Sequence, residues 1–106
     1  MRDVVFLGSA KAELIAFPVT ARHMAGRQLM LVQLGREPVD WKPMTTIGPG
    51  AAEIRVSDAT GAYRVIYVAK FKDTVFVLRC FKKTSQKTSR RDLDVAIARY
   101  RLIAEQ

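Results

Sequence analysis

The sequence predicts a single α+β domain over residues 1–106, and three observations favour that fold class. A short apolar strand is followed by two segments with helical apolar spacing. A proline-rich loop comes next, and beyond it the apolar period changes from helical to two. The three runs with this period are joined by turns too short for parallel crossovers. We therefore expect an N-terminal strand and helical hairpin, an antiparallel β-meander and a C-terminal helix.

The N-terminal third is predicted to be mostly helical. The expected elements are a strand at 4–7, a helix from Ala10 that Pro18 ends or kinks, and a helix that begins between Pro18 and Ala21 and runs to Leu34. Gly35 is a natural cap for the second helix, because a left-handed residue closes helix ends. The link between the two helices is short, so we expect them to form the hairpin.

Residues 36–50 are predicted to form a loop, because three of the four prolines lie there. Trp41 within it is interpreted as a lid over the core or, alternatively, as a stacking platform for a base. The expected strands cover 52–56, 63–71 and 75–82, with turns between them. A polar loop at 84–88 precedes a helix over 93–104, which Ser89 and Asp92 begin with the spacing of a capping box.

Positive charge dominates the chain. Eighteen Lys and Arg against ten Asp and Glu give a net charge of +8. Between residues 79 and 91 there is no acid, and the cations there are Arg79, Lys82, Lys83, Lys87, Arg90 and Arg91. Concentrated cations bind phosphate polymers by releasing counterions, so the pattern predicts a polyanion partner. The alternative is a solvated basic segment.

Several classes of protein are disfavoured. No apolar run reaches the roughly 18 residues of a bilayer span, and the N-terminus lacks the features of a secretory signal, so we expect a cytoplasmic protein without membrane contact. Cys80, the single cysteine, lies in an apolar run and is expected to be buried. No Cys/His spacing for zinc and no clustered carboxylates occur, so neither a metal nor a cofactor is expected.

Four short motifs occur in order along the chain. They are Lys42–Pro43 in the loop, EIRV at 53–56, GAYRVIY at 61–67 and VLRCFKKT at 77–84. Together they resemble the RelE and HigB superfamily of bacterial toxins, most closely its phage-derived HigB-like branch. The resemblance implies a RelE-like fold similar to microbial ribonucleases. It also implies the toxin of a type II toxin–antitoxin pair, with a helix-turn-helix antitoxin, mRNA and the ribosome as partners.

The activity implied by the resemblance is endoribonuclease cleavage of ribosome-bound mRNA, in which the ribose 2′-OH attacks the adjacent phosphate. Such chemistry requires a base, an acid and cations at the phosphate. By motif position, Arg64 holds the phosphate through its planar fork, and Arg55 shares it. Lys82 and Lys83 match a basic pair of the family, so that one exchanges a proton while the other holds phosphate. Glu53 is either the base or an ion-pair partner.

The remaining predictions concern RNA binding and the departures from the family. The residues expected to bind RNA are Lys42, Arg79, Lys87, Arg90, Arg91, Tyr63 and Tyr67, with core packing as the alternative for the tyrosines. Some relatives carry a tyrosine after the last strand, where this chain has Ser85, Gln86 and Lys87. His23 is interpreted as a surface residue. Two alternatives therefore stay open, a non-catalytic RNA-binding or phage regulatory protein and a module that binds an acidic protein.

Overall fold

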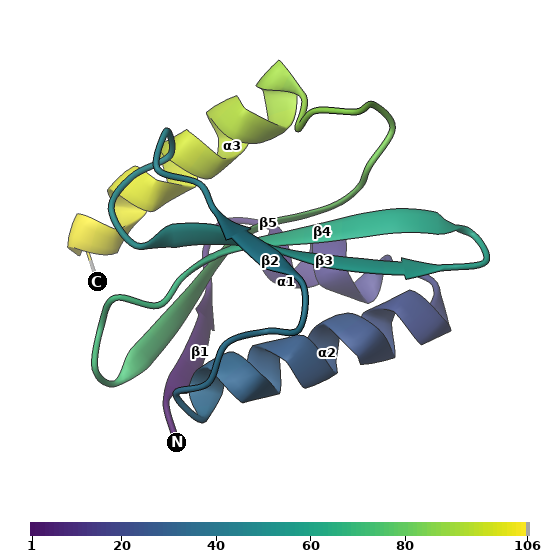
Figure 1. The fold of residues 1–106 in the computed structure, drawn as a ribbon. Coiled ribbons are helices and arrows are strands. Elements are labelled where there is room, and N and C mark those ends of the chain that lie inside the picture. The colour runs from purple at the N-terminus through teal and green to yellow at the C-terminus, as the bar shows by residue number, and fades with distance from the viewer. Residues whose placement is uncertain (106) are drawn as a thin grey trace.

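A five-stranded sheet separates two layers of helices in the computed structural model, which describes residues 1–105 (Figure 1). The elements are β1 (Asp3–Phe6), α1 (Ala10–Ile15), α2 (Val19–Gln33), β2 (Trp41–Pro43), β3 (Ala51–Asp58), β4 (Gly61–Val68), β5 (Thr74–Lys82), α3 (Arg90–Arg101) and the 3₁₀ turn η1 (Leu102–Glu105). Helices α1 and α2 lie on one side of the sheet and α3 on the other. The predicted α+β class is confirmed.

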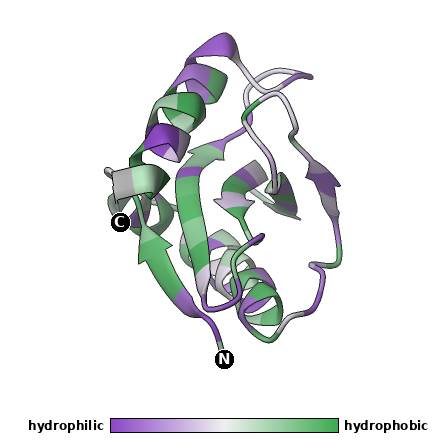
Figure 2. Ribbon diagram, turned by 90° about the vertical axis from the view of Figure 1, so that its left-hand side faces the viewer, coloured by the Kyte–Doolittle hydropathy of each residue, from purple (hydrophilic) through white to green (hydrophobic). Residues whose placement is uncertain are grey.

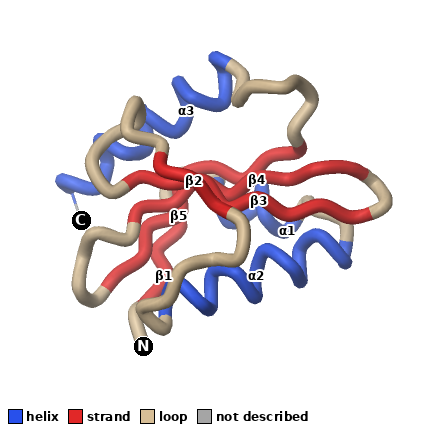
Figure 3. The backbone as a smooth tube through the Cα atoms, in the orientation of Figure 1, coloured by secondary structure: helices blue, strands red, loops and turns tan. Residues whose placement is uncertain are grey.

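The strand order is β1-β5-β4-β3-β2, shown as red segments in Figure 3. Strands β3, β4 and β5 form the predicted antiparallel meander. Strand β1 pairs in parallel with β5, with Asp3 opposite Thr74. The prediction that 36–50 is entirely loop was wrong, because Trp41 begins β2, which pairs with β3 at the sheet edge. Pro43 is tolerated there because an edge strand leaves one side without a ladder partner.

Side chains along each strand point alternately to the two faces of the sheet, so the hydrophobic core has two halves. Ile54, Val65 and Val77 face α1 and α2, whereas Ile66 and Leu78 face α3. Strand β4 is therefore mostly apolar on both faces, with Arg64 as its buried charged residue. In Figure 2 much of the sheet is green, whereas the helices carry alternating purple and green bands. Each such fully buried aliphatic side chain contributes roughly 1.5–3 kcal/mol of transfer free energy. This central strand holds Arg64 in a rigid frame.

Local signals account for the helix ends. Pro18 is the N-cap of α2, and α1 ends three residues before it, in keeping with the restricted backbone of proline. Helix α1 packs on β5, while α2 packs mainly on β3. At α3, the Ser89 hydroxyl accepts a hydrogen bond of 3.1 Å from the Asp92 backbone N–H, as the capping pattern predicted. Within residues 1–105, no helix has the length and apolarity to cross a bilayer.

Cys80 is buried on β5, as predicted. Burial raises the pKa of its thiol to about 12, and the nearby Glu13 carboxylate adds to that shift. The thiolate is the reactive form of cysteine, so this side chain is inert at neutral pH. Its role is to fill the core.

Candidate active site

Charged side chains from three strands and one strand end gather on the sheet face that α3 covers. Strand alternation places Glu53 and Arg55 on the same face of β3, and cross-strand register puts Arg64 of β4 directly opposite Arg55. Lys42 of β2 lies opposite Glu53. Lys83, just beyond β5, is close enough for its pKa to respond to the charges of the other four. We call Lys42, Glu53, Arg55, Arg64 and Lys83 the Glu53 cluster.

Glu53 is the centre of this cluster and is only 1% exposed. Its Oε1 lies 3.4 Å from Nε of Arg55 and 3.4 Å from Nε of Arg64. Its Oε2 accepts a hydrogen bond of 2.7 Å from the Thr88 hydroxyl. Like charges directly opposite one another in a sheet repel. The carboxylate between the two guanidinium groups offsets that repulsion and fixes both side chains.

Arg64 is the most enclosed cation of the cluster, at 8% exposure. Its Nη1 donates to the Tyr63 carbonyl at 3.0 Å, but its buried Nε has no hydrogen-bond partner among the described residues. Burial lowers the pKa of Arg64, and the Arg55 charge lowers it further, while the charges of Glu53 and Asp40 oppose both effects. Arginine remains protonated despite such shifts. The site therefore holds a positive charge that is largely shielded from water.

Lys83 completes the positive field. Loss of hydration lowers the pKa of its ammonium group, and the charges of Arg64, Arg55 and Lys42 lower it further, with Glu53 opposing them. The cluster contains four cations and one carboxylate, and Asp40, which lines the adjoining hollow and whose charge also acts on Arg64, leaves a surplus of two positive charges. Unpaired cations at a partly enclosed surface attract phosphate. The arrangement is therefore suited to binding an anion.

Two hollows adjoin the cluster. Arg55 and Arg64 line one of about 350 Å³ together with Asp40 and Ser57. Lys42 lines a neighbouring one of about 390 Å³, between the segment after β2 and the loop from β5 to α3. The residues of this second hollow are Lys42, Pro43, Met44, Thr45, Thr46, Gln86, Lys87, Thr88 and Leu93. Each hollow is of a size that accommodates one nucleotide unit.

Lys82 does not join the cluster, although the sequence paired it with Lys83. Successive residues of a strand point to opposite faces, and Lys82 lies beside Tyr63 on the α1 side. Arg79 is also separate, because Glu13 and Asp92 bind its guanidinium at 2.6 and 2.9 Å. Four of the five predicted catalytic residues therefore meet, and Lys82 does not.

The other predicted RNA-binding residues are dispersed. Tyr63 and Tyr67 share a face, as expected, but it is the buried face toward α2, where the ring of Phe17 lies 4.8 Å from that of Tyr63. Arg90 forms an exposed ion pair with Asp94 at 3.0 Å. Arg91 is exposed as well. Two exceptions are Lys42, which belongs to the Glu53 cluster, and Lys87, which lines the same hollow as Lys42; both are exposed. His23 on α2 is exposed, as its interpretation as a surface residue predicted.

Thr88 is the site residue that the sequence did not indicate. The sequence predicts only a polar loop there, yet the Thr88 hydroxyl donates to the buried carboxylate 35 positions away. No local pattern reports such a contact, because it depends on how the loop after β5 crosses the sheet. Tyr100 of α3 does not belong to the Glu53 cluster, and its hydroxyl donates to the Pro49 carbonyl at 2.7 Å.

Comparison with known proteins adds one finding. The model of the family described as Phage derived protein Gp49-like matches residues 12–101. The matched segment includes every residue of the Glu53 cluster. No curated protein matches the chain.

Proposed function

Because the chain belongs to the family of phage-derived Gp49-like proteins, we propose that it is the toxin of a type II toxin–antitoxin pair and cleaves ribosome-bound mRNA at the Glu53 cluster. The family match agrees with the resemblance to RelE and HigB toxins in the four sequence motifs. The observation that carries the proposal is the surplus of cations around one buried carboxylate. A cytoplasmic location and a helix-turn-helix antitoxin are parts of the same proposal.

The cluster supports a division of roles. Arg64 and Arg55, held side by side across β3 and β4, bind the scissile phosphate and stabilise the charge that develops when the 2′-OH attacks it. Lys83 has a lowered pKa, which makes its ammonium a better proton donor to the leaving 5′-oxygen. Solvent water takes the proton that the 2′-OH loses as its oxygen bonds to phosphorus, and Lys83 donates a proton to the 5′-oxygen as its bond to phosphorus breaks. Cleavage then leaves a 2′,3′-cyclic phosphate on one product and a 5′-OH on the other.

Glu53 is assigned a positioning role. Its two oxygens already face Arg55, Arg64 and Thr88, and it is almost completely buried. A 2′-OH has no access to either oxygen unless Thr88 moves. We therefore assign to this carboxylate the orientation of the two guanidinium groups rather than proton removal.

Purified protein incubated with RNA tests the proposal. The expected result is cut RNA with 2′,3′-cyclic phosphate ends, detected by mass spectrometry, in the presence of EDTA. Products with 3′-OH ends, or cleavage abolished by EDTA, would contradict the mechanism. Induced expression with and without the neighbouring gene tests the toxin assignment, since growth should stop and mRNA ends should appear only when the antitoxin is absent.

A non-catalytic RNA-binding protein is the second candidate, and one observation favours it. The loop at 85–87 contains no tyrosine, and the Tyr100 hydroxyl is engaged by Pro49 and Lys70. A protein of this kind binds RNA with strong salt dependence but yields no cut products. The same incubation therefore separates the two candidates. Binding to an acidic protein instead of RNA would contradict both.

A further inference from the structure

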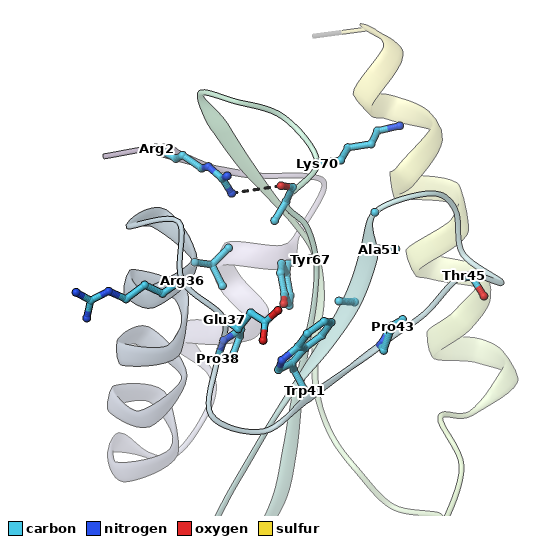
Figure 4. Close-up of a pocket in the computed structure, with 14 residues that line it drawn as sticks. Arg2, Arg36, Glu37, Pro38, Trp41, Pro43, Thr45, Ala51, Tyr67 and Lys70 are labelled. Carbon is cyan, nitrogen blue, oxygen red and sulfur yellow. Dashed lines mark hydrogen bonds between the residues drawn. The ribbon is translucent and has the colours of Figure 1, made fainter.

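A separate pocket of about 320 Å³ lies against the other side of the edge strand β2 (Figure 4). Trp41 and Tyr67 supply its aromatic surface, and the Glu37 carboxylate is directed toward the same space. Three cations, Arg2, Arg36 and Lys70, also line it. We call this the Trp41 pocket. None of its functional groups belongs to the Glu53 cluster.

The polar groups of the Trp41 pocket are available to a ligand. Tyr67 lines the pocket although its side chain is only 4% exposed, and Glu37, whose charge acts on the Tyr67 hydroxyl, is exposed. Burial raises the pKa of Tyr67 to about 12, and the Glu37 charge adds to the shift, so the hydroxyl keeps its proton at neutral pH. Trp41 is only partly buried. A flat ligand therefore has an aromatic face for stacking, a donor and a charged acceptor.

Charge and position relate this pocket to RNA. Three cations against one carboxylate favour a ligand with net negative charge, although Arg36 and Lys70 point outward in Figure 4 and would bind phosphate at the rim. Pro43 and Thr45 line both the Trp41 pocket and the hollow that contains Lys42. A polynucleotide strand that binds Lys42 therefore has a continuous path around the edge of β2 into this pocket.

We propose that the Trp41 pocket binds one unstacked nucleobase of the RNA substrate and prefers guanine. Single-stranded RNA is commonly read by stacking splayed bases on aromatic side chains and by hydrogen bonds to their Watson–Crick edges. Guanine presents two adjacent donors, N1–H and the exocyclic amine, which match the two oxygens of Glu37. Uracil presents one donor between two acceptors and fits a carboxylate poorly. The identification of the polymer as RNA rests on the proposed function.

The single tryptophan makes the proposal directly measurable. In ¹⁵N-labelled protein its indole N–H gives one signal, which is followed while guanosine or uridine 5′-monophosphate is added. We expect saturable movement with both nucleotides and about tenfold tighter binding of the guanine nucleotide, the scale of a hydrogen bond to a charged group. An unmoved indole signal at saturating nucleotide would overturn the proposal, as would a preference for uridine monophosphate.

Two variants test whether the Glu37 carboxylate accepts the hydrogen bonds of guanine. Glu37→Gln should remove most of the guanine preference while leaving the fold intact, because Glu37 is an exposed loop residue. Asp73→Asn is the matched control, since Asp73 is an exposed acid outside the pocket, and it should retain the preference. Equal losses in both variants, or none in Glu37→Gln, would show that Glu37 does not read the base.

Arg64→Ala distinguishes this pocket from the Glu53 cluster. In that variant the indole signal should still respond to guanosine monophosphate, while cleavage is lost. Loss of the indole response would mean that the base binds at the Glu53 cluster, and would refute base binding in the Trp41 pocket. If the wild-type protein responds to nucleotide but cuts no RNA, only the nuclease proposal fails. Arginine amide is the competing probe, because a stronger response to it would identify the pocket as a site for a basic peptide and overturn nucleobase binding.

Discussion

Two carboxylates in this protein are each held by two arginines, yet their surroundings differ. Glu13 of α1 binds Arg79 at 2.6 Å and Arg99 at 2.8 and 2.9 Å, and Arg79 also binds Asp92. That network contains two carboxylates and two guanidinium groups. The Glu53 cluster has four cations around one buried carboxylate, with Asp40 as a second carboxylate beside Arg64. The first arrangement is balanced and the second has positive charge left over.

The difference shows that charge balance, rather than residue type, separates a structural ion network from a binding site. The Glu13 network joins α1, β5 and α3, and Arg99 also donates to the Leu78 carbonyl at 2.9 Å. Its two guanidinium charges are matched by two carboxylates, so no positive charge is left over. In the Glu53 cluster the carboxylate fixes two arginines without neutralising the site. A phosphate would supply the missing negative charge, as expected for a site that is incomplete without its ligand.

The largest expected effect comes from Arg64. Arg64→Ala removes a donor to the developing phosphate charge and should lower the cleavage rate by about 10² to 10³, the scale of losing one transition-state donor. Arg64→Lys keeps the charge but loses the planar fork, so it should recover only part of the rate. Single-turnover kinetics on a defined RNA measure both.

Arg27→Ala is the control for this series, because Arg27 is exposed on α2, on the opposite side of the sheet. It should leave the rate nearly unchanged. A rate equal to wild type in a folded Arg64→Ala protein, checked by circular dichroism, would refute the site assignment. The distinction between the two carboxylate environments would then have no functional meaning.

Glu13→Gln should reduce stability rather than chemistry. Removing one partner of a buried ion network costs roughly 3–5 kcal/mol, and we expect about 2–3 kcal/mol here because Glu13 is partly exposed. Denaturant unfolding at pH 7 measures this loss. At equal folded fraction the variant should still bind RNA, and a selective loss of binding would show that the Glu13 network belongs to the site.

The pH dependence of stability sharpens this prediction. Although burial opposes it, hydrogen bonds and charges from Arg99, Cys80 and Arg79 leave the pKa of Glu13 lowered. A lowered folded-state pKa contributes stability that is present above the unfolded pKa of roughly 4.3 and is lost as pH falls through the folded value. Glu13→Gln should therefore flatten the acid limb of the stability profile below about pH 4.3. An acid limb as steep as that of wild type would contradict this linkage.

Substitution of the two adjacent lysines should give effects of intermediate size on the cleavage rate. Lys83→Ala should lower cleavage by about tenfold or more, because it removes a proton donor next to the phosphate. Lys82→Ala should have little effect, since its side chain lies on the other face of the sheet. Measured rates in the reverse order would mean that the strand end rearranges when RNA binds.

The smallest expected effect is on salt dependence. If the four cations of the cluster each contact a phosphate, log K for single-stranded RNA should fall against log salt with a slope of roughly −3. Lys42→Ala should reduce that slope by about 0.7, the contribution of one contact. Fluorescence anisotropy with a short oligonucleotide measures both slopes. A slope near zero would exclude phosphate binding by the surplus cations.

Much of the site was accessible from the sequence because strands alternate. Glu53 and Arg55 are two apart and therefore share a face, and the motif around Arg64 placed it in the neighbouring strand. The same alternation separates Lys82 from Lys83, whereas the resemblance to the family motif pairs them. The engagement of Arg79 by Glu13, 66 positions away, gave no local signal.

Helices, strands and caps followed from interactions between near neighbours. The apolar period, Pro18 and the Ser89 cap each act over a few residues, and the surplus of positive charge is a property of composition. Pairing of β1 with β5, the assignment of one sheet face to α3 and the approach of Thr88 to Glu53 depend on contacts between distant residues. The tertiary structure therefore decides which cations are neutralised and which stay free, because an ion pair forms only where folding brings its partners together.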